Sequence, residues 1–312
     1  MSPNPVRPML RVRSRLTAGT MTTPVAIAAA VAGIGAYAFF MRRSSSANTA
    51  AAVKEPFASF GFYNLRLQSS ELVNHNTKRL RFELPDPNVK SGLSLTSAVL
   101  TISFPNGSWI PCIRPYTPTN DLSMNEKGFI DLMVKLYPNG KQSTHLHSLK
   151  PGDTLRFAPI KEIAWTPNQH PDIALIAGGA GITPMYQLTR GILSNPKDKT
   201  RITLVWGVNA DEDIFLRDEF AQLEREHPGQ FKATYVVSRP EEGSKLARGY
   251  VDREVLEGAG IGGEKGKEDV KVLVCGPPAM EKALTGSKGM FGSSQKGVLH
   301  EMGFRGDQIH RF

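Results

Sequence analysis

Cysteine is scarce in this sequence: only Cys112 and Cys275 occur, and neither belongs to a CxxC pattern. Two cysteines cannot build a disulfide framework, and a structural zinc site needs about four closely spaced ligands. The seven histidines are scattered, and the closest pair, His145 and His147, is more readily explained as solvated or packed side chains than as ligands. The sequence therefore predicts no metal site, and it gives no indication of an oxidising compartment.

Acidic residues are absent from positions 1–54, which hold seven arginines and lysines. The 312-residue chain has a formal net charge of +9, but removing these seven from its 38 basic residues leaves 31 against 29 acidic ones. The rest of the chain is thus nearly neutral. Because it contains no basic patch interleaved with aromatic residues, the sequence argues against nucleic-acid binding.

The same N-terminal segment predicts a targeting signal and a membrane anchor. Arginine, serine and threonine without acidic residues are typical of a mitochondrial targeting segment. Residues 24–41 are 18 uncharged residues flanked by arginines, and at about 1.5 Å per residue such a helix covers roughly 27 Å, close to the bilayer core. A secretory signal peptide is the alternative, although its apolar core is usually about 7–15 residues long. We therefore expect residues 1–54 to hold a targeting segment, an anchor over about 24–41 and a polar linker.

The remaining sequence has two parts with different patterns of strand-like and helix-like segments. Between Phe60 and Ile160, proline, glycine and asparagine separate the short stretches FYNLRLQSSELV, KRLRFELP, SAVLTISFP, FIDLMVKLYP and DTLRFAPI. Such spacing is typical of a small antiparallel β-barrel. From Asp172, the apolar runs IALIAG, TRITLVWGV, FKATYVVS and VKVLVCG end in glycine or serine turns, with helix-like segments between them. This alternation predicts a parallel, Rossmann-like sheet with crossover helices. The expected fold is a two-domain β + α/β chain, with a barrel over 55–165 and a nucleotide-binding domain over 166–312.

Three short motifs carry most of the chemistry: RPYTP at 114–118, GGAGITP at 178–184 and CGPP at 275–278. The first combines a cation, an aromatic face and a hydroxyl, which suits a diphosphate and a planar ring. The other two follow predicted strands, and parallel sheets bind ligands at the carboxyl ends of their strands. Each motif alone is also explained by an ordinary turn, and GGAGITP lacks the GxGxxG spacing. Their combination favours a flavin and nucleotide site.

With VKLYPNGKQS at 134–143, HLHSLKPGDTLRF at 145–157 and a terminal phenylalanine, these motifs make the sequence resemble the ferredoxin reductase superfamily. Within it, the sequence looks like the membrane-anchored mitochondrial form of the NADH-cytochrome b5 reductases, from about residue 55 to the end. The resemblance implies an FAD-binding barrel followed by an NAD(P)H-binding domain. It also implies that hydride passes from NAD(P)H to FAD, and single electrons then pass to a cytochrome b5-type haem protein.

By this resemblance, the flavin site begins at RPYTP. Arg114 would bind the diphosphate, and Tyr116 would lie along the flavin. Thr117 would place its hydroxyl near flavin N5, the atom that accepts hydride, and Pro115 would stiffen the backbone between them. Without its neighbours, Arg114 would be explained as a surface residue before a turn.

A second flavin segment follows. Val134, Lys135 and Tyr137 are expected on one strand, with Lys135 and Tyr137 on the same side. The resemblance gives Lys135 a role at the flavin and nicotinamide and Tyr137 a cofactor contact, whereas a surface lysine is the alternative.

The diphosphate would also meet backbone amides and a hydroxyl of the segment Gly140, Lys141, Gln142 and Ser143. Relatives often have methionine in place of Gln142. Because the backbone makes the contact, this difference should matter little.

The nucleotide is expected at Gly178, Gly179, Gly181, Thr183, Pro184, Cys275, Gly276, Pro277 and Pro278. By the resemblance, Thr183 and Pro184 would also touch the flavin, and Phe312 would complete the flavin pocket. The glycines allow a tight turn and a close approach to a pyrophosphate. Cys275 would lie near the nicotinamide ring without acting as a nucleophile, and a core cysteine is the alternative. A disordered terminus is the alternative for Phe312. Thr117, Lys135, Thr183 and Cys275 are the residues expected to form the hydride path.

One position departs from the pattern of NADH-selective relatives. They tend to carry an acidic residue after the strand TYVVS, where it accepts hydrogen bonds from ribose hydroxyls and repels a 2′-phosphate. This chain has Ser238 followed by Arg239. We therefore expect NADPH to be used beside NADH.

Location and partners remain to be predicted. We expect a monomer with a single span in the mitochondrial outer membrane, with an additional processed form in the intermembrane space. Two rival functions stay open: a flavin reductase serving another one-electron acceptor, and a non-catalytic nucleotide-binding protein tethered to a membrane.

Overall fold

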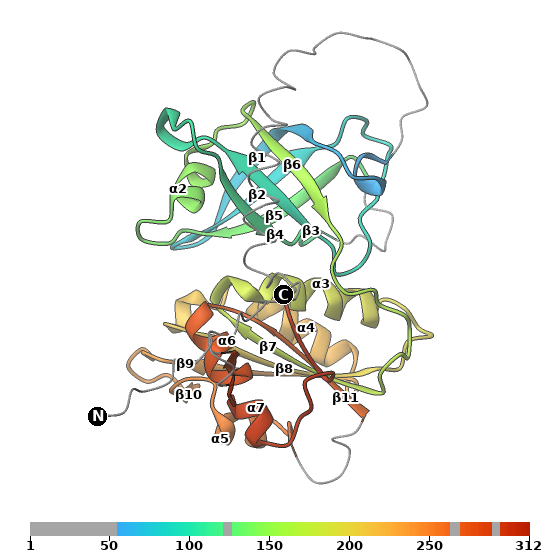
Figure 1. Ribbon diagram of the computed structural model, residues 1–312, viewed down its shortest axis with the longest axis vertical. Coiled ribbons are helices and arrows are strands. Elements are labelled where there is room, and N and C mark those ends of the chain that lie inside the picture. Colours follow the sequence, from blue (N-terminus) through green and yellow to red (C-terminus); the bar gives the residue numbers. More distant parts are fainter. Residues whose placement is uncertain (1–54, 121–126, 263–268, 289–293) are drawn as a thin grey trace, which may run out of the picture. The chain divides into compact units, whose positions relative to one another are not determined.

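The computed structural model describes residues 55–120, 127–262, 269–288 and 294–312, and the expected targeting segment and anchor lie outside these ranges. Within them, no helix is both long and apolar enough to cross a membrane. The described chain forms an antiparallel sheet followed by a parallel sheet (Figure 1). This order confirms the two-domain β + α/β prediction.

The first sheet has six antiparallel strands in the order β4-β3-β6-β1-β2-β5. They are β1 (Tyr63–Asn74), β2 (Thr77–Glu83), β3 (Ala98–Ser103), β4 (Cys112–Tyr116), β5 (Phe129–Lys135) and β6 (Thr154–Ile160). The short helices are η1 (Pro56–Ala58), η2 (Pro105–Gly107) and α2 (Lys141–Ser148). The edge strands β4 and β5 approach each other at an isolated antiparallel bridge between Pro118 and Leu132, which brings the two edges of the sheet together.

Alternation of side chains explains the core of this sheet. In β2, Leu80 and Phe82 are fully buried while Arg79 and Arg81 face outward, as the two-residue repeat of a strand requires. The rings of Phe82 and Phe157 meet edge to face, with centroids 4.9 Å apart. The interior is therefore filled by side chains, and ligands must bind outside it.

The second sheet has six parallel strands in the order β10-β9-β8-β7-β11-β14. They are β7 (Asp172–Gly178), β8 (Arg201–Val208), β9 (Phe231–Val237), β10 (Ala247–Arg248), β11 (Val270–Cys275) and β14 (Ile309–Arg311). The helices are η3 (Gly179–Gly181), α3 (Ile182–Leu193), η4 (Asp211–Asp213), α4 (Arg217–Glu226), α5 (Arg253–Gly258), α6 (Pro278–Thr285) and α7 (Val298–Glu301). A small hairpin pairs β12 (Ser287–Lys288) with β13 (Ser294–Gln295).

Both faces of the parallel sheet are covered. Leu175 and Ala177 of β7 join a cluster with residues of α3 and α4, whereas Ala174 and Ile176 join another with residues of α5, α6 and α7. The chain runs from β7 to β8 on one side and later returns to β11 on the other. The strand order therefore reverses between β7 and β11, and their carboxyl ends form the crevice where such sheets bind ligands.

One local prediction was wrong, and one helix was missed. The strand β5 ends at Lys135, so Tyr137 does not share a strand face with Lys135. Tyr137 precedes Pro138, which restricts its backbone and marks the turn toward α2. The helix α2 was not predicted, because it is only eight residues long and buries one large apolar side chain, Leu146.

Candidate functional site

The ends of β7 and β11 are held together backbone against backbone. The two strands pair in parallel up to Ala177 and Cys275. A Cβ atom added at Gly181 would collide with the carbonyl oxygen of Cys275, and one added at Gly178 would lie 2.6 Å from the Met280 sulfur. The motifs GGAGITP and CGPP therefore form one contact, which tolerates only glycine at position 181.

The glycine turn is fixed from both sides. Gly179 has a positive φ of 52°, and its carbonyl oxygen accepts a hydrogen bond of 3.0 Å from Trp206 Nε1. The hydroxyl of Thr183, in the first turn of α3, donates to the Ala180 carbonyl at 3.2 Å. Thr183 and Pro184 are buried at the start of this helix. Its free amide groups favour negative charge at the carboxyl edge of the sheet.

RPYTP lies on the edge strand β4 and continues beyond it. Arg114 is exposed, and its guanidinium donates to the Ile113 carbonyl at 2.7 Å. Burial raises the pKa of Tyr116, which packs partly against the barrel core. Thr117 is buried, and the carbonyl oxygen of Pro118 accepts a hydrogen bond from the parallel-sheet domain.

That donor is Gln187 of α3, which sequence reasoning missed. Its side chain is buried, donates to Pro118 at 3.0 Å and accepts from the Thr96 N–H at 2.7 Å. Gln187 lies one helical turn after Thr183. The flavin motif and the nucleotide helix are thus joined by one side chain, and the only signal in the sequence is an amide on an apolar helix.

The segment at the start of α2 lies beside the strand that carries Arg114. The Ser143 hydroxyl accepts a bond from the Tyr137 N–H at 3.2 Å and donates to the Gly140 carbonyl at 3.1 Å. Gln142 is buried, and its side chain bonds to Ser103 and Thr101 of β3. The side chain of Gln142 therefore faces the barrel. This agrees with the expectation that only the backbone at this position contacts the diphosphate. Arg114 and the amides at the start of α2 make a donor set that fits a diphosphate.

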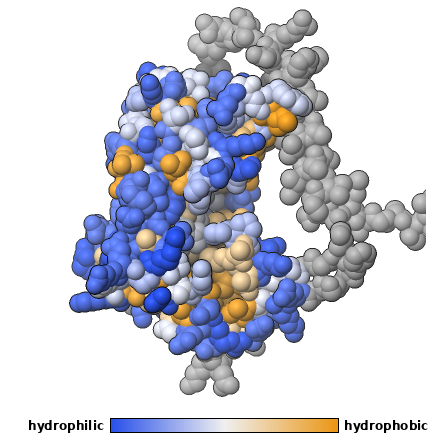
Figure 2. Space-filling view, turned by 90° about the vertical axis from the view of Figure 1, so that its left-hand side faces the viewer, coloured by the Kyte–Doolittle hydropathy of each residue, from blue (hydrophilic) through white to orange (hydrophobic). Residues whose placement is uncertain are grey.

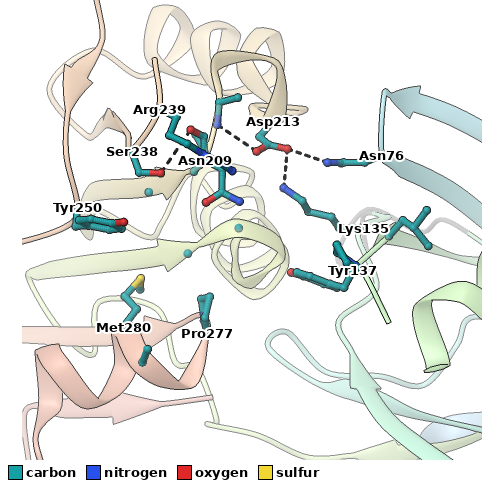
Figure 3. A pocket seen from close by; sticks show the side chains of 18 of the residues that line it. Asn76, Lys135, Tyr137, Asn209, Asp213, Ser238, Arg239, Tyr250, Pro277 and Met280 are labelled. Atoms are coloured by element: carbon teal, nitrogen blue, oxygen red, sulfur yellow. Dashed lines mark hydrogen bonds and ion pairs between the residues drawn. The ribbon is translucent and has the colours of Figure 1, made fainter. Parts of the chain in front are cut away.

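A cavity of about 890 Å³ opens beside the crevice. This volume is within the range of cofactor sites, roughly 300–1,000 Å³. Among the predicted residues, its wall includes Lys135, Tyr137, Gly178, Gly179, Ser238, Arg239 and Pro277 (Figure 3). The face shown in Figure 2 is hollowed between the two domains, and apolar residues gather at the lower edge of the hollow.

Other predicted residues do not belong to this wall. They are Arg114, Pro115, Tyr116, Thr117, Val134, Gly140, Lys141, Gln142, Ser143, Gly181, Thr183, Pro184, Cys275, Gly276, Pro278 and Phe312. Sequence reasoning also missed several wall residues, including Asn76, Asn209, Asp213, Tyr250 and Met280. Met280 closely follows the CGPP motif, which could have indicated it, whereas the other four stand in segments without a motif.

Lys135 is not a surface lysine. Its side chain is 8% exposed and donates to Asp213 Oδ1 at 2.6 Å, and the Asp213 side chain is 4% exposed. Burial alone would raise the pKa of Asp213, but hydrogen bonds from Lys135 and Asn76 and the charge of Lys135 lower it below its ordinary value. The Asp213 carboxyl is therefore ionised, and the pair is largely shielded from solvent at the edge of the cavity.

Cys275 and Phe312 lie together at the end of β11. Burial, with smaller effects of Glu281 and Glu162, raises the pKa of the Cys275 thiol to about 12, so the thiol is neutral at physiological pH. The Phe312 N–H donates to the Val274 carbonyl at 3.1 Å, and its ring packs edge to face on His310. A disordered terminus is thus excluded, and a neutral thiol agrees with a role that does not involve nucleophilic attack.

Comparison with known proteins identifies the family. Residues 64–164 match the oxidoreductase FAD-binding domain model and residues 175–285 match the oxidoreductase NAD-binding domain model. NADH-cytochrome b5 reductase 2 of Pyricularia oryzae is 43% identical over 297 residues, covering 92% of this chain and 88% of that protein. The chain belongs to the NADH-cytochrome b5 reductase family. The protein of the same name from Botryotinia fuckeliana is 48% identical over 256 residues, covering 81% of this chain and 72% of that protein.

Solved structures agree with this assignment. The cytochrome b5 reductase domain of Ulva prolifera nitrate reductase is 30% identical with a TM-score of 0.71, covering 81% of this chain and 97% of that one. The CS-b5R domains of human Ncb5or are 22% identical with a TM-score of 0.66, covering 81% and 70%, and show the same fold. The predicted family is therefore confirmed.

The contact at Gly181 generates a prediction. In Gly181→Ala the added Cβ collides with the Cys275 carbonyl, and neither backbone can yield without disturbing its strand. We expect a loss of about 1–3 kcal/mol of stability and at least about tenfold weaker binding of NAD⁺, measured by urea denaturation and calorimetry.

The matched control is Gly258→Ala at the end of α5, where an added Cβ meets nothing within 4 Å. It should leave stability unchanged or raise it by up to about 1 kcal/mol. Unchanged NAD⁺ binding and stability in Gly181→Ala would refute the contact.

Proposed function

We propose that this chain acts as an NADH-cytochrome b5 reductase, with FAD and NADH as its cofactors and cytochrome b5 as its electron acceptor. The observation that carries the proposal is the junction of the two motifs: the GGAGITP turn contacts CGPP, while α3 bonds the last residue of RPYTP. When held there, FAD would supply the chemistry of a hydride acceptor that releases single electrons. The protein contributes the positions of both partners.

Each proposed role follows from a side chain's surroundings. The exposed Arg114 guanidinium and the amides at the start of α2 bind the diphosphate of FAD. Thr117 and Thr183 flank the junction, where their burial excludes water. Cys275 supports the nicotinamide side with a neutral thiol.

The test is optical. The purified chain should be yellow, NADH should bleach it, and cytochrome b5 should restore the colour in stopped-flow mixing. Arg114→Ala should lose most of the bound FAD, whereas Arg201→Ala should keep it, since Arg201 pairs with Asp172 at the other end of the parallel strands. A colourless protein would support the non-catalytic alternative. Bleaching without reoxidation by cytochrome b5 would support another acceptor.

We further propose that NADPH is used beside NADH. Ser238 and Arg239 line the cavity next to Tyr250, and their backbone N–H groups donate to Val208 and Asn209. Within the described ranges, no hydrogen bond or ion pair engages the Arg239 guanidinium. A cation beside a serine neither repels a 2′-phosphate nor offers a carboxylate to the ribose.

Steady-state kinetics with both nucleotides check this proposal. We expect the kcat/KM ratio of NADH to NADPH to stay below about a thousandfold, and Ser238→Asp to raise it by at least about tenfold, because a carboxylate repels the phosphate. Ser59→Asp adds the same charge at an exposed residue outside the cavity wall and should leave the ratio unchanged. A wild-type ratio above a thousandfold would refute the proposal.

We also propose that residues 24–41 anchor a monomer in the mitochondrial outer membrane by a single span. The support is the length of the uncharged run and the lack of acidic residues before Glu55. The full chain should stay in the membrane pellet after alkaline carbonate extraction, and a chain lacking 24–41 should be released. Release of the full chain would contradict the anchor, and protease added to intact mitochondria would report its orientation.

A further inference from the structure

A single buried carboxylate joins the barrel to the parallel sheet at the edge of the nucleotide cavity. Asp213 belongs to η4, which follows β8, and its side chain is 4% exposed. Lys135 at the end of β5 donates to its Oδ1 atom at 2.6 Å, and Asn76 in the β1–β2 turn donates to the same atom at 3.0 Å. All three residues line the cavity (Figure 3).

The two oxygens of this carboxylate serve different domains. Oδ2 accepts the Ala210 N–H at 3.2 Å, while the Asp213 N–H donates back to the Ala210 carbonyl at 3.1 Å. This reciprocal pair fixes the side chain on its own turn. Oδ1 is then available for Lys135 and Asn76, both of which come from the barrel.

The barrel residues that reach Asp213 are linked to one another. Lys135 pairs with Thr77 across β2 and β5, and the Leu136 N–H donates to the Asn76 carbonyl at 2.7 Å. The same β1–β2 turn is held a second time, because Asn74 donates to the Glu212 carbonyl at 2.7 Å. Both barrel partners of Asp213 are therefore tied to the end of β5 and the β1–β2 turn.

The chain that follows Lys135 lies close to the glycine turn at the cavity wall. Tyr137 stands two residues after Lys135, and its hydroxyl lies 3.6 Å from the position of a Cβ atom at Gly179. Hydride transfer requires reacting atoms held within about 3–3.5 Å, and a misplacement of about 1 Å costs up to about a hundredfold in rate. The spacing between the two domains at this point therefore affects the rate of hydride transfer.

We propose that Asp213 is a positioning residue that sets the distance between the flavin-binding and nucleotide-binding domains for hydride transfer. The proposal rests on the proposed reductase function. Both carboxylate oxygens of Asp213 accept hydrogen bonds, one from the Ala210 N–H and the other from Lys135 and Asn76. An asparagine has only one acceptor oxygen, because its other group is a donor. Asp213→Asn therefore preserves the shape but cannot satisfy the Ala210 turn and the barrel together.

The first test is stopped-flow reduction of the FAD-loaded protein by NADH. Asp213→Asn should lower the limiting rate of flavin reduction by about tenfold to a hundredfold, while photoreduced flavin should be reoxidised by ferricyanide at the wild-type rate. The control is Asp131→Asn in β5, a buried carboxylate that Arg81 holds at 2.8 and 2.7 Å. It is not in the cavity wall, and its reduction rate should be unchanged.

The second test measures the contacts of Asp213 directly, without enzymatic turnover. Hydrogen exchange of the FAD-loaded protein without nucleotide should be faster in Asp213→Asn at the amides of Ala210 and Leu136, and unchanged there in Asp131→Asn. If Asp213→Asn does not hold FAD, Asn76→Ala removes one of the two barrel bonds and should lower the reduction rate by at least about threefold.

Three outcomes would overturn the proposal. They are a reduction rate within twofold of wild type in the tested variant, an equal loss in Asp131→Asn, or an equal loss in the ferricyanide step. Failure of the reductase function is a separate result, because wild-type flavin would then not be bleached by NADH.

Discussion

The close approach of Gly181 to the Cys275 carbonyl is the constraint on which the rest of the site depends. Parallel pairing brings β7 and β11 to the same level, but only a residue without a side chain lets the following turns touch. This contact directs the start of α3, with Thr183, toward the crevice. It also leaves the Cys275 thiol shielded, so that its pKa is raised and its charge is suppressed.

The sequence predicted those parts of the molecule that local patterns encode. Alternation and apolar runs located the strands, and the glycine motifs located the turns, because only glycine tolerates such backbone contacts. The sequence did not predict Gln187, Asp213 or Asn76. Their contacts join residues that are 69, 78 and 137 positions apart, and no local pattern reports on such pairs. The shared strand face of Lys135 and Tyr137 failed because the strand ends before Pro138.

The charged residues of the cavity are distributed unevenly. At the barrel edge, Asp213 forms an ion pair with Lys135, so these two residues together add little net charge to the cavity. Elsewhere in the wall, Arg239 contributes a positive charge beside Ser238, and Glu212 contributes a negative one. The positive charge of Arg239 therefore favours a phosphate group near that residue.

Two of the hydrogen bonds between the domains hold the same part of the barrel. Gln187 bonds to Pro118, and Asp213 bonds to Lys135 at the end of β5. Pro118 itself bridges to Leu132 of β5, where the two edges of the barrel meet. Both attachments thus act on the seam of the barrel, which is also where the RPYTP motif ends. The seam is thus held from outside near the flavin motif, where the distance to the nucleotide matters for hydride transfer.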